Sequence, residues 1–304
     1  MSYITSHASE SAANAGSVVG GLDLGPVLPP SPLTLVPAQI QAAIAQNQLL
    51  ATRIGWGVLY DAIASWILRF RNMTPAAGTF AQAVARWQMR HGLPPTGSID
   101  ATTWSAMLAS AKEGIPRPFQ TPEGVVRPHG LQAIVATFGD PTQTGWEARN
   151  IVRVTAPAGQ AFAPGVTRRP VHRLIAPQFD RLFAAINSAG LWTQFFPDAG
   201  TWVCRTKKSH GKQPCGTPGI QRNQLSNHSW GIAIDFRAPA YPFYTAGMQQ
   251  AGRPLRYPPA TISSIFQDHG FQWGLWFVDG RLTARGRIDF TGADPMHFQF
   301  ATGF

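Results

Sequence analysis

The sequence predicts an α+β protein whose N-terminal part is all helical. Between residues 38 and 108, apolar residues recur three or four positions apart, which is the spacing of one packed helix face. Beyond residue 130, short alternating or β-branched runs are interleaved with helical stretches, a pattern typical of mixed α and β structure. We therefore expect four segments: a flexible arm at 1–37, a helical domain at 38–112, a Pro- and Gly-rich linker at 113–130, and an α+β domain at 131–304.

The helical domain is predicted from apolar stripes and from residues that begin or end helices. Gly92 stands where a left-handed cap closes the helix that starts near Phe80, and Asp100 is the expected N-cap of the next helix. The arm is rich in Ser, Ala, Gly and Pro and has too little apolar surface to fold alone. The earlier stripes contain Ile40, Ala43, Ile44 and Leu49, then Leu59, Ile63, Trp66, Ile67 and Phe70.

The α+β domain is predicted from a few local patterns. Residues 177–189 form an amphipathic helix pattern that begins with proline, which is tolerated in a first turn. Further helices are expected at 130–138 and 261–269. Alternating or β-prone runs predict strands at 150–155 and 232–236.

The formal net charge is +10 although only 13% of the residues are charged, and most of the excess lies in residues 113–304. A basic surface speeds encounters with polyanions, which include nucleic acids, anionic lipids and bacterial envelope polymers. The tightest basic group is Arg205, Lys207, Lys208 and Lys212. It lacks the aromatic and basic repeat of a nucleic-acid module, so we expect no nucleic-acid binding.

The sequence indicates no secretory leader and no membrane anchor. Lysine and arginine are absent before Arg53, so the positive segment of a signal peptide is missing. The longest apolar run, at 54–68, is interrupted by Asp61 and is too short to span a bilayer. We expect a monomer without an integral membrane segment, made in the cytoplasm and reaching its place of action without a cleaved leader.

Two cysteines, Cys204 and Cys215, lie eleven positions apart. A disulfide in an oxidising compartment, two free thiols, and thiolate ligation of zinc are all compatible with this spacing.

The first candidate site residues lie around a short apolar strand. Asp235 sits within the run at 232–236, where an ionised carboxylate is costly unless a positive group compensates it. A metal ion is such a group. His228 lies seven positions earlier, beyond Gly231, and reaches the same point if the chain turns before the strand.

A second segment supplies another imidazole. In a strand, His297 and Gln299 share one face while Phe298 and Phe300 point to the other, toward the core. Two imidazoles and one carboxylate are a ligand set that zinc accepts, with one position left open for catalysis. Each residue alone is more often an ordinary hydrogen-bonded core residue, and the joint pattern carries the hypothesis.

Part of the helical domain resembles the second half of the bacterial peptidoglycan-binding domain of the three-helix type. The resemblance implies attachment to the cell wall but identifies no ligand residue, and a bundle used for packing or partner docking is the alternative. The matching residues are Phe80, Val84, Trp87, Gln88, Gly92, Leu93, Gly97, Asp100, Thr103, Trp104 and Leu108.

Residues from about 120 to 304 resemble the zinc peptidases of the D-alanyl-D-alanine carboxypeptidase and L-alanyl-D-glutamate endopeptidase superfamily. An acidic-x-x-His element of that superfamily is matched by Asp294 and His297, and the resemblance implies an α+β fold of the hedgehog/DD-peptidase type. Leu275 stands where many relatives have glycine. The signature Ser-x-His-x-x-Gly-x-Ala-x-Asp is matched by Ser226, His228, Gly231, Ala233 and Asp235.

The resemblance also implies roles. His228, Asp235 and His297 would bind Zn²⁺, and Asp294 would be the general base that takes a proton from the attacking water. Arg205 would steady the substrate or its carboxylate, with an ordinary surface ion pair as the alternative. The expected substrate-binding residues are Ser226, which also orients the His228 loop, and Trp230, Trp273 and Trp276, for which core packing is the alternative.

These patterns predict a peptidoglycan hydrolase with a wall-binding helical domain. The bond expected to be cleaved is L-alanyl-D-glutamate in the stem peptide, as in endolysins. D-alanyl-D-alanine carboxypeptidase activity is the alternative within the same chemistry, and a non-catalytic wall-binding protein is the alternative outside it. A phage lysin and an effector delivered by a secretion machine both fit the missing leader.

Overall fold

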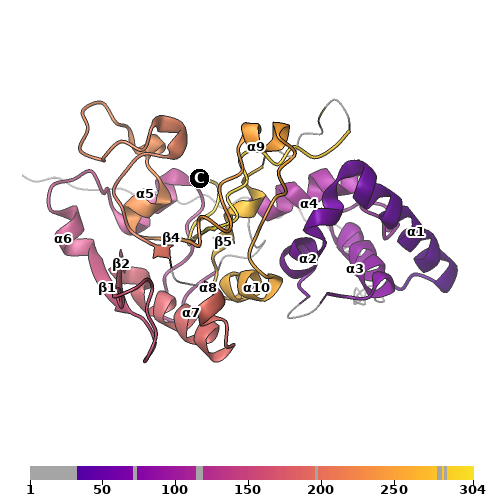
Figure 1. Ribbon diagram of the computed structural model, residues 1–304, viewed down its shortest axis with the longest axis horizontal. Helices are drawn as coiled ribbons and strands as arrows, with labels where there is room; N and C mark the ends of the chain where they lie inside the picture. Colours follow the sequence, from indigo (N-terminus) through magenta and orange to yellow (C-terminus); the bar gives the residue numbers. More distant parts are fainter. Residues whose placement is uncertain (1–32, 71–73, 114–118, 196–197, 279–282, 284–285) are drawn as a thin grey trace, which may run out of the picture. The chain divides into compact units, whose positions relative to one another are not determined.

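The N-terminal segment is helical, as predicted (Figure 1). The structure is a computed structural model that describes residues 33–70, 74–113, 119–195, 198–278, 283 and 286–304. Most of the expected flexible arm and part of the expected linker therefore lie outside the described residues. The helical elements are α1 (Pro37–Ile54), a 3₁₀ turn (Trp56–Leu59), α2 (Tyr60–Ala62), a π-helical turn (Ile63–Ile67), α3 (Ala77–Arg90) and α4 (Ala101–Glu113).

Helix α1 buries Ala43 and partly buries Ile40 and Ile44, as expected, but the stripe differs at its end. Leu49 was predicted on the packed face, but it is 57% exposed and Leu50 is buried instead. The buried positions are spaced for one helical face and include Asn47. The side chain of Asn47 donates to the Gly97 carbonyl at 2.9 Å and accepts from the Ile99 N–H at 2.9 Å. A polar residue thus belongs to the core because its amide ties α1 to the turn before α4.

The predicted helix boundaries near α4 are confirmed. Asp100 Oδ1 accepts the backbone N–H of Thr103 at 2.7 Å, which is an N-cap bond. Gly92 has φ of 70° and follows the end of α3, in the left-handed region that favours glycine. The chain therefore reverses between the two helices at the residues that the sequence indicated.

The following segment mixes helices with small antiparallel sheets, as predicted. Strands β1 and β2 form a two-stranded sheet, in which Ile151 lies opposite His172. The predicted helices at 130–138, 177–189 and 261–269 correspond to α5, α7 and α10. The elements are α5 (Gly130–Phe138), α6 (Trp146–Asn150), β1 (Ile151–Thr155), β2 (Arg168–His172), α7 (Ala176–Ser188), α8 (Trp192–Phe195), α9 (Ala246–Gln250) and α10 (Ala260–Asp268).

A four-stranded antiparallel sheet, in the order β3-β4-β6-β5, carries the candidate site. Its strands are β3 (Ala199–Gly200), β4 (Ala233–Phe236), β5 (Gln272–Trp273) and β6 (His297–Gln299). The register places Asp235 of β4 opposite His297 of β6, and Gln272 of β5 opposite Gln299 of β6. Residues far apart in the sequence become cross-strand neighbours.

One face of this sheet is a core of stacked aromatic rings. The Phe298 ring centroid lies 3.9 Å from that of Phe266 in α10 and 5.6 Å from that of Trp273, with both pairs stacked. Phe298 is fully buried. Since side chains alternate along a strand, His297 and Gln299 face the other side, which confirms the predicted alternation.

The helical segment packs directly against the second segment. Thr34 to Phe304 form one compact unit. The rings of Trp66 and Trp273 meet edge to face with centroids 6.0 Å apart. Gln267 Nε2 of α10 donates to the Trp66 carbonyl at 2.8 Å. The boundaries at 38–112 and 131–304 stay predictions. Within the part of the chain described here, no helix is both long enough and apolar enough to cross a membrane.

His172, at the end of β2, is a buried imidazole whose neutral form fits its surroundings. Nδ1 accepts the Leu174 N–H at 3.2 Å, and Nε2 faces the Phe138 carbonyl at 3.2 Å. The backbone N–H of His172 donates to the Gly231 carbonyl at 3.0 Å, which ties β2 to the start of β4. Burial lowers the pKa of His172 to about 4, although the Phe138 carbonyl acts in the opposite direction.

We predict that the free energy of unfolding decreases as the pH falls from 6.5 to about 4 because of His172. The unfolded chain takes up a proton near pH 6.5, whereas the folded chain resists it until about pH 4, so acid favours unfolding. This difference corresponds to roughly 3 kcal/mol. Urea denaturation of the wild type and His172→Gln across this range measures it. The variant should show a flatter pH dependence, and parallel curves would contradict the prediction.

Candidate metal centre and its pocket

The turn that carries His228 is built from residues with defined local roles. Ser226 caps the 3₁₀ turn Asn227–Trp230, because its Oγ accepts the His228 N–H at 3.4 Å. The turn ends at Gly231 with φ of 68°. A Cβ at this glycine would lie 2.7 Å from the backbone nitrogen of His172, so only glycine fits. Strand β4 then begins at Ala233 and returns the chain toward His228, so that Asp235 lies beside the His228 ring.

The structure brings together the three residues that were expected as metal ligands. The Nε2 atom of His228 lies 3.1 Å from Asp235 Oδ1, and the Nδ1 atom of His297 lies 2.8 Å from the same oxygen. One ligand atom from each of the three residues lies within 4.8 Å of the others. The three side chains thus form a cluster of two imidazoles and one carboxylate at the bottom of a pocket.

Each imidazole turns its other nitrogen to a hydrogen-bond acceptor. His228 Nδ1 faces the Thr201 carbonyl, and His297 Nε2 faces Gln299 Oε1 at 2.9 Å. In the neutral rings these nitrogens carry the hydrogens, so His228 Nε2 and His297 Nδ1 present lone pairs to Asp235. Among the described residues, His228 Nε2 is buried without a hydrogen-bond partner. Converging lone pairs repel unless a cation lies among them, so the donor set fits a metal ion.

The electrostatics of the cluster favour positive charge. In the metal-free cluster, burial raises the pKa of Asp235, but the nearby charges of His228 and His297 and the hydrogen bond to His297 outweigh it, and the net pKa lies well below the ordinary value. Burial lowers the pKa of His297, but its hydrogen bond to Asp235 and the carboxylates of Asp235 and Asp294 raise it to about 9. The metal-free cluster therefore retains a proton in the region that a cation would occupy.

Asp294 lies beside the cluster in the turn that leads into β6. The His297 N–H donates to the Asp294 carbonyl at 3.0 Å, and the Asp294 N–H donates to the Gly274 carbonyl at 2.9 Å. A Cβ at Gly274 would lie 2.6 Å from the Asp294 carbonyl oxygen, so this approach requires glycine. Within the described chain, Asp294 Oδ1 is buried and has no hydrogen-bond partner. Burial, followed by the Asp235 carboxylate, raises the pKa of Asp294 to about 6.

The cluster and Asp294 line a cavity of about 330 Å³ with a basic rim. Arg205 and Ser226 line it, while their predicted roles toward a substrate stay predictions, and Arg205 Nη1 donates to the Thr206 carbonyl at 3.0 Å. Lys207, Lys208 and Lys212 are part of the tightest basic group in the sequence, but no role at the site was predicted for them. In the structure, Lys207 Nζ lies 3.6 Å from the centre of the Phe304 ring. The other residues that line the cavity are Lys208, Ser209, Lys212, Asn227, Phe243, Phe277, Met296 and Gln299.

Trp230, Trp273 and Trp276, which were expected to line the groove, belong to the core. All three are fully buried, and none is among the residues of the cavity. The indole N–H of Trp230 donates to the Gly139 carbonyl, and that of Trp273 donates to the Pro295 carbonyl, both at 2.8 Å. Trp273 lies opposite Phe298 in the sheet, on the aromatic face. The strand pairing therefore decides the place of Trp273.

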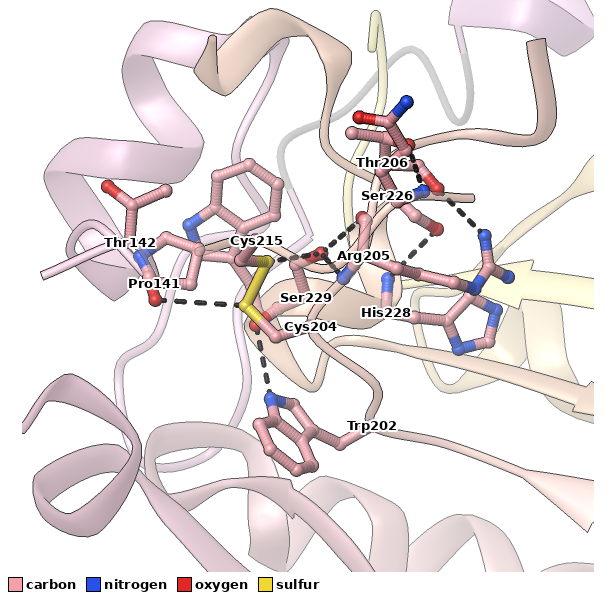
Figure 2. Close-up of a disulfide and its surroundings, with 12 residues drawn as sticks. Pro141, Thr142, Trp202, Cys204, Arg205, Thr206, Cys215, Ser226, His228 and Ser229 are labelled. Atoms are coloured by element: carbon pink, nitrogen blue, oxygen red, sulfur yellow. Dashed lines mark hydrogen bonds between the residues drawn. A yellow bond between two sulfur atoms is a disulfide. The ribbon is translucent and has the colours of Figure 1, made fainter. Parts of the chain in front are cut away.

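A disulfide between Cys204 and Cys215 supports the basic wall of the pocket (Figure 2). Of the three alternatives for the cysteines, the structure contains the disulfide. Cys215 Sγ lies 3.7 Å from Ser229 Oγ. This hydroxyl donates to the Arg205 carbonyl at 2.8 Å and accepts the Arg205 N–H at 3.1 Å. The Ser229 hydroxyl thereby joins the loop that carries Arg205 to the turn that carries His228, and the disulfide lies against it.

Comparison with protein families finds two matches. The D-alanyl-D-alanine carboxypeptidase family matches residues 220–281, and the putative peptidoglycan-binding domain family matches residues 77–107. Neither the curated proteins nor the solved structures contain a match to the chain. The two matches confirm the predicted resemblance and its order along the chain, and they support a peptidase that acts on peptidoglycan. The first match includes His228 and Asp235 but ends before Asp294 and His297, and the pairing of β6 with β4 brings His297 into the cluster.

We predict that replacing both cysteines, Cys204→Ser with Cys215→Ser, lowers the free energy of unfolding by about 3 kcal/mol. The crosslink closes a short loop and removes conformational freedom from the unfolded chain, and about 3 kcal/mol is the size expected for such a loop. Urea denaturation with and without a reductant measures the effect. Reductant should destabilise the wild type by a similar amount and leave the double variant unchanged. A wild type indifferent to reductant would contradict the prediction.

Proposed function

We propose that this protein is a zinc-dependent peptidoglycan peptidase that cleaves the stem peptide, with the L-alanyl-D-glutamate bond as its preferred target. The observation that carries the proposal is the convergence of His228 Nε2, Asp235 Oδ1 and His297 Nδ1 beside the buried carboxylate of Asp294. Three nitrogen and oxygen ligands with a neighbouring acid are the composition of a catalytic zinc site, in which one position stays open.

His228, Asp235 and His297 would hold the ion. When bound, zinc polarises a carbonyl group and increases the acidity of a water molecule. The hydrogen bonds from His228 to Thr201 and from His297 to Gln299 keep both rings oriented and raise their basicity as ligands.

Asp294 is suited to move the proton during hydrolysis. Its pKa of about 6 leaves it ionised at neutral pH while keeping its affinity for a proton higher than that of an ordinary carboxylate. Its Oδ1 atom has no competing hydrogen bond within the described residues. As general base, Asp294 takes a proton from the attacking water and returns it to the amine that leaves.

The basic rim suits an anionic peptide. Stem peptides carry free carboxylates, and the planar guanidinium of Arg205 is matched to such a group. Lys207 and Lys208 add positive charge that aromatic rings cover on one side, which reduces the competition from water. D-alanyl-D-alanine carboxypeptidase activity is a second candidate, and the name of the family that matches residues 220–281 favours it.

The setting that we propose is the bacterial cell wall. The peptidoglycan-binding match at residues 77–107 supports peptidoglycan as the partner of the helical segment. Lysis from within an infected cell and delivery into a competing cell both bring the protein to this substrate.

We predict that the purified protein contains near-stoichiometric zinc and that His228→Ala loses most of it, because one of three ligands is removed. His210→Ala is the matched control, since His210 is exposed and lies outside the cluster. Asp294→Asn should keep the zinc but lower kcat by roughly 10²- to 10⁴-fold, as expected for loss of a general base. Elemental analysis and peptide hydrolysis measure both effects. Full zinc content in His228→Ala, or an unchanged rate in Asp294→Asn, would refute the corresponding role.

We predict that digestion of purified sacculi releases new amino-terminal glutamate, because the preferred bond lies between L-alanine and D-glutamate. Mass spectrometry of the products with amino-terminal labelling measures it, with Asp294→Asn as the inactive control. Release of terminal D-alanine alone would identify the carboxypeptidase instead. If neither product forms while zinc is bound, the peptidase proposal is wrong.

A further inference from the structure

A row of buried amide side chains connects the metal cluster to the helical segment. Gln299 of β6 and Gln272 of β5 lie opposite each other in the sheet. Only 1% and 2% of their surfaces are exposed. Buried polar groups are costly unless they are hydrogen-bonded, so the partners of these amides reveal what they do.

Gln299 is held at both ends of its amide. Its Oε1 atom faces two nitrogens, Nε2 of His297 at 2.9 Å and Nδ2 of Asn227 at 2.6 Å. Its Nε2 atom donates to Gln272 Oε1 at 3.3 Å and to the Ala301 carbonyl at 3.2 Å. Reversing the amide would set its NH₂ group against the NH₂ group of Asn227 and its oxygen against two acceptors. The network therefore requires an acceptor at His297 Nε2.

Gln272 continues the row to helix α4. Its Nε2 atom donates to the Lys112 carbonyl and, at 3.4 Å, lies within reach of the Ala111 carbonyl. These carbonyls belong to the last described turn of α4, which spans Ala101–Glu113. The carboxyl end of a helix also carries partial negative charge, which favours an N–H donor. The row thus runs from α4 through Gln272 and Gln299 to His297.

We propose that Gln299 and Gln272 are positioning residues for the metal centre, and that the last turn of α4 is a structural part of it. This inference rests on the proposed metal centre. With an acceptor fixed at Nε2, the hydrogen of neutral His297 stays on that nitrogen and the Nδ1 lone pair faces the cluster. Without it, Nδ1 carries the hydrogen and donates to Asp235, which removes His297 from the ligand set.

The helical segment then has a second task beyond attachment to the wall. Its α4 carbonyls orient Gln272, Gln272 orients Gln299, and Gln299 selects the tautomer of a ligand. Loss of a group that orients a metal-binding histidine typically weakens metal affinity by about 10- to 100-fold. The effect should be largest at Gln299, which touches the ligand, and smaller at Gln272, which acts through it.

The chain offers a matched control in Gln267. It is buried to a similar degree, and its Nε2 atom donates to the Trp66 carbonyl of the helical segment at 2.8 Å. Gln267→Leu therefore breaks an equivalent bond between the two segments without touching the row. A general loss of packing would affect this variant as much as the others.

The experiment measures zinc affinity of the full-length protein in competition with a chromogenic chelator, with thermal unfolding as the check of folding. We expect Gln299→Leu to bind zinc about 10- to 100-fold more weakly than the wild type, and Gln267→Leu to bind within about 2-fold. Gln272→Leu should fall between them. Unchanged affinity in folded Gln299→Leu overturns the role of Gln299. Unchanged affinity in Gln272→Leu overturns the connection to α4.

A second measurement needs no variant that can fail to fold. Nitrogen NMR of histidine side chains in the zinc-loaded wild type reports which ring nitrogen carries the hydrogen. We expect Nε2–H for His297, and Nδ1–H at this residue overturns the inference even if Gln299→Leu does not fold. A wild type that binds no zinc is a different result, because it refutes the metal centre itself.

Discussion

The antiparallel pairing of β4 with β6 is the constraint on which the rest of the site depends. It sets Asp235 opposite His297 and leaves Phe298 on the aromatic face. A register shift of one residue would place Phe298 in the polar pocket and His297 among the aromatic rings. Both placements would strongly destabilise the fold. Hydrophobic packing on one side of the sheet thereby positions polar chemistry on the other.

The pocket has two regions that favour ligands of opposite charge. Its floor gathers lone pairs and a carboxylate, and it favours a positive charge. Its rim carries Arg205, Lys207 and Lys208, and it favours anionic groups. Asp294 also lines the pocket, with its Oδ1 atom buried and its pKa raised. A cation at the floor and an anionic peptide at the rim suit both regions, which is the arrangement that the proposed peptidase requires.

The helical segment is closely integrated with the fold of the peptidase segment. Trp66 packs on Trp273, and the carbonyls of the last turn of α4 receive Gln272. These contacts are largely buried, so they differ from the wet contacts that flexibly tethered domains make. Within the described residues, the helical segment is thus a structural part of the fold that carries the site.

The sequence by itself determined the local features of this protein. The helix limits near Gly92 and Asp100, the alternation of β6, and the identity of His228, Asp235, His297 and Asp294 follow from short-range patterns or from a motif. The pattern alone did not determine which of two adjacent leucines in α1 is buried: Leu49 is exposed and Leu50 is buried, although they differ by only one position on the helix.

Only the tertiary structure decided which distant groups meet. The burial of the three tryptophans, the disulfide, the aromatic rings beneath the lysines and the Gln272–Gln299 row depend on strand register and on loop closure over many residues. Local composition carries no information about a partner that lies tens of positions away. The physical reason is that long-range contacts form only when the intervening chain gives up the conformational entropy that loop closure costs.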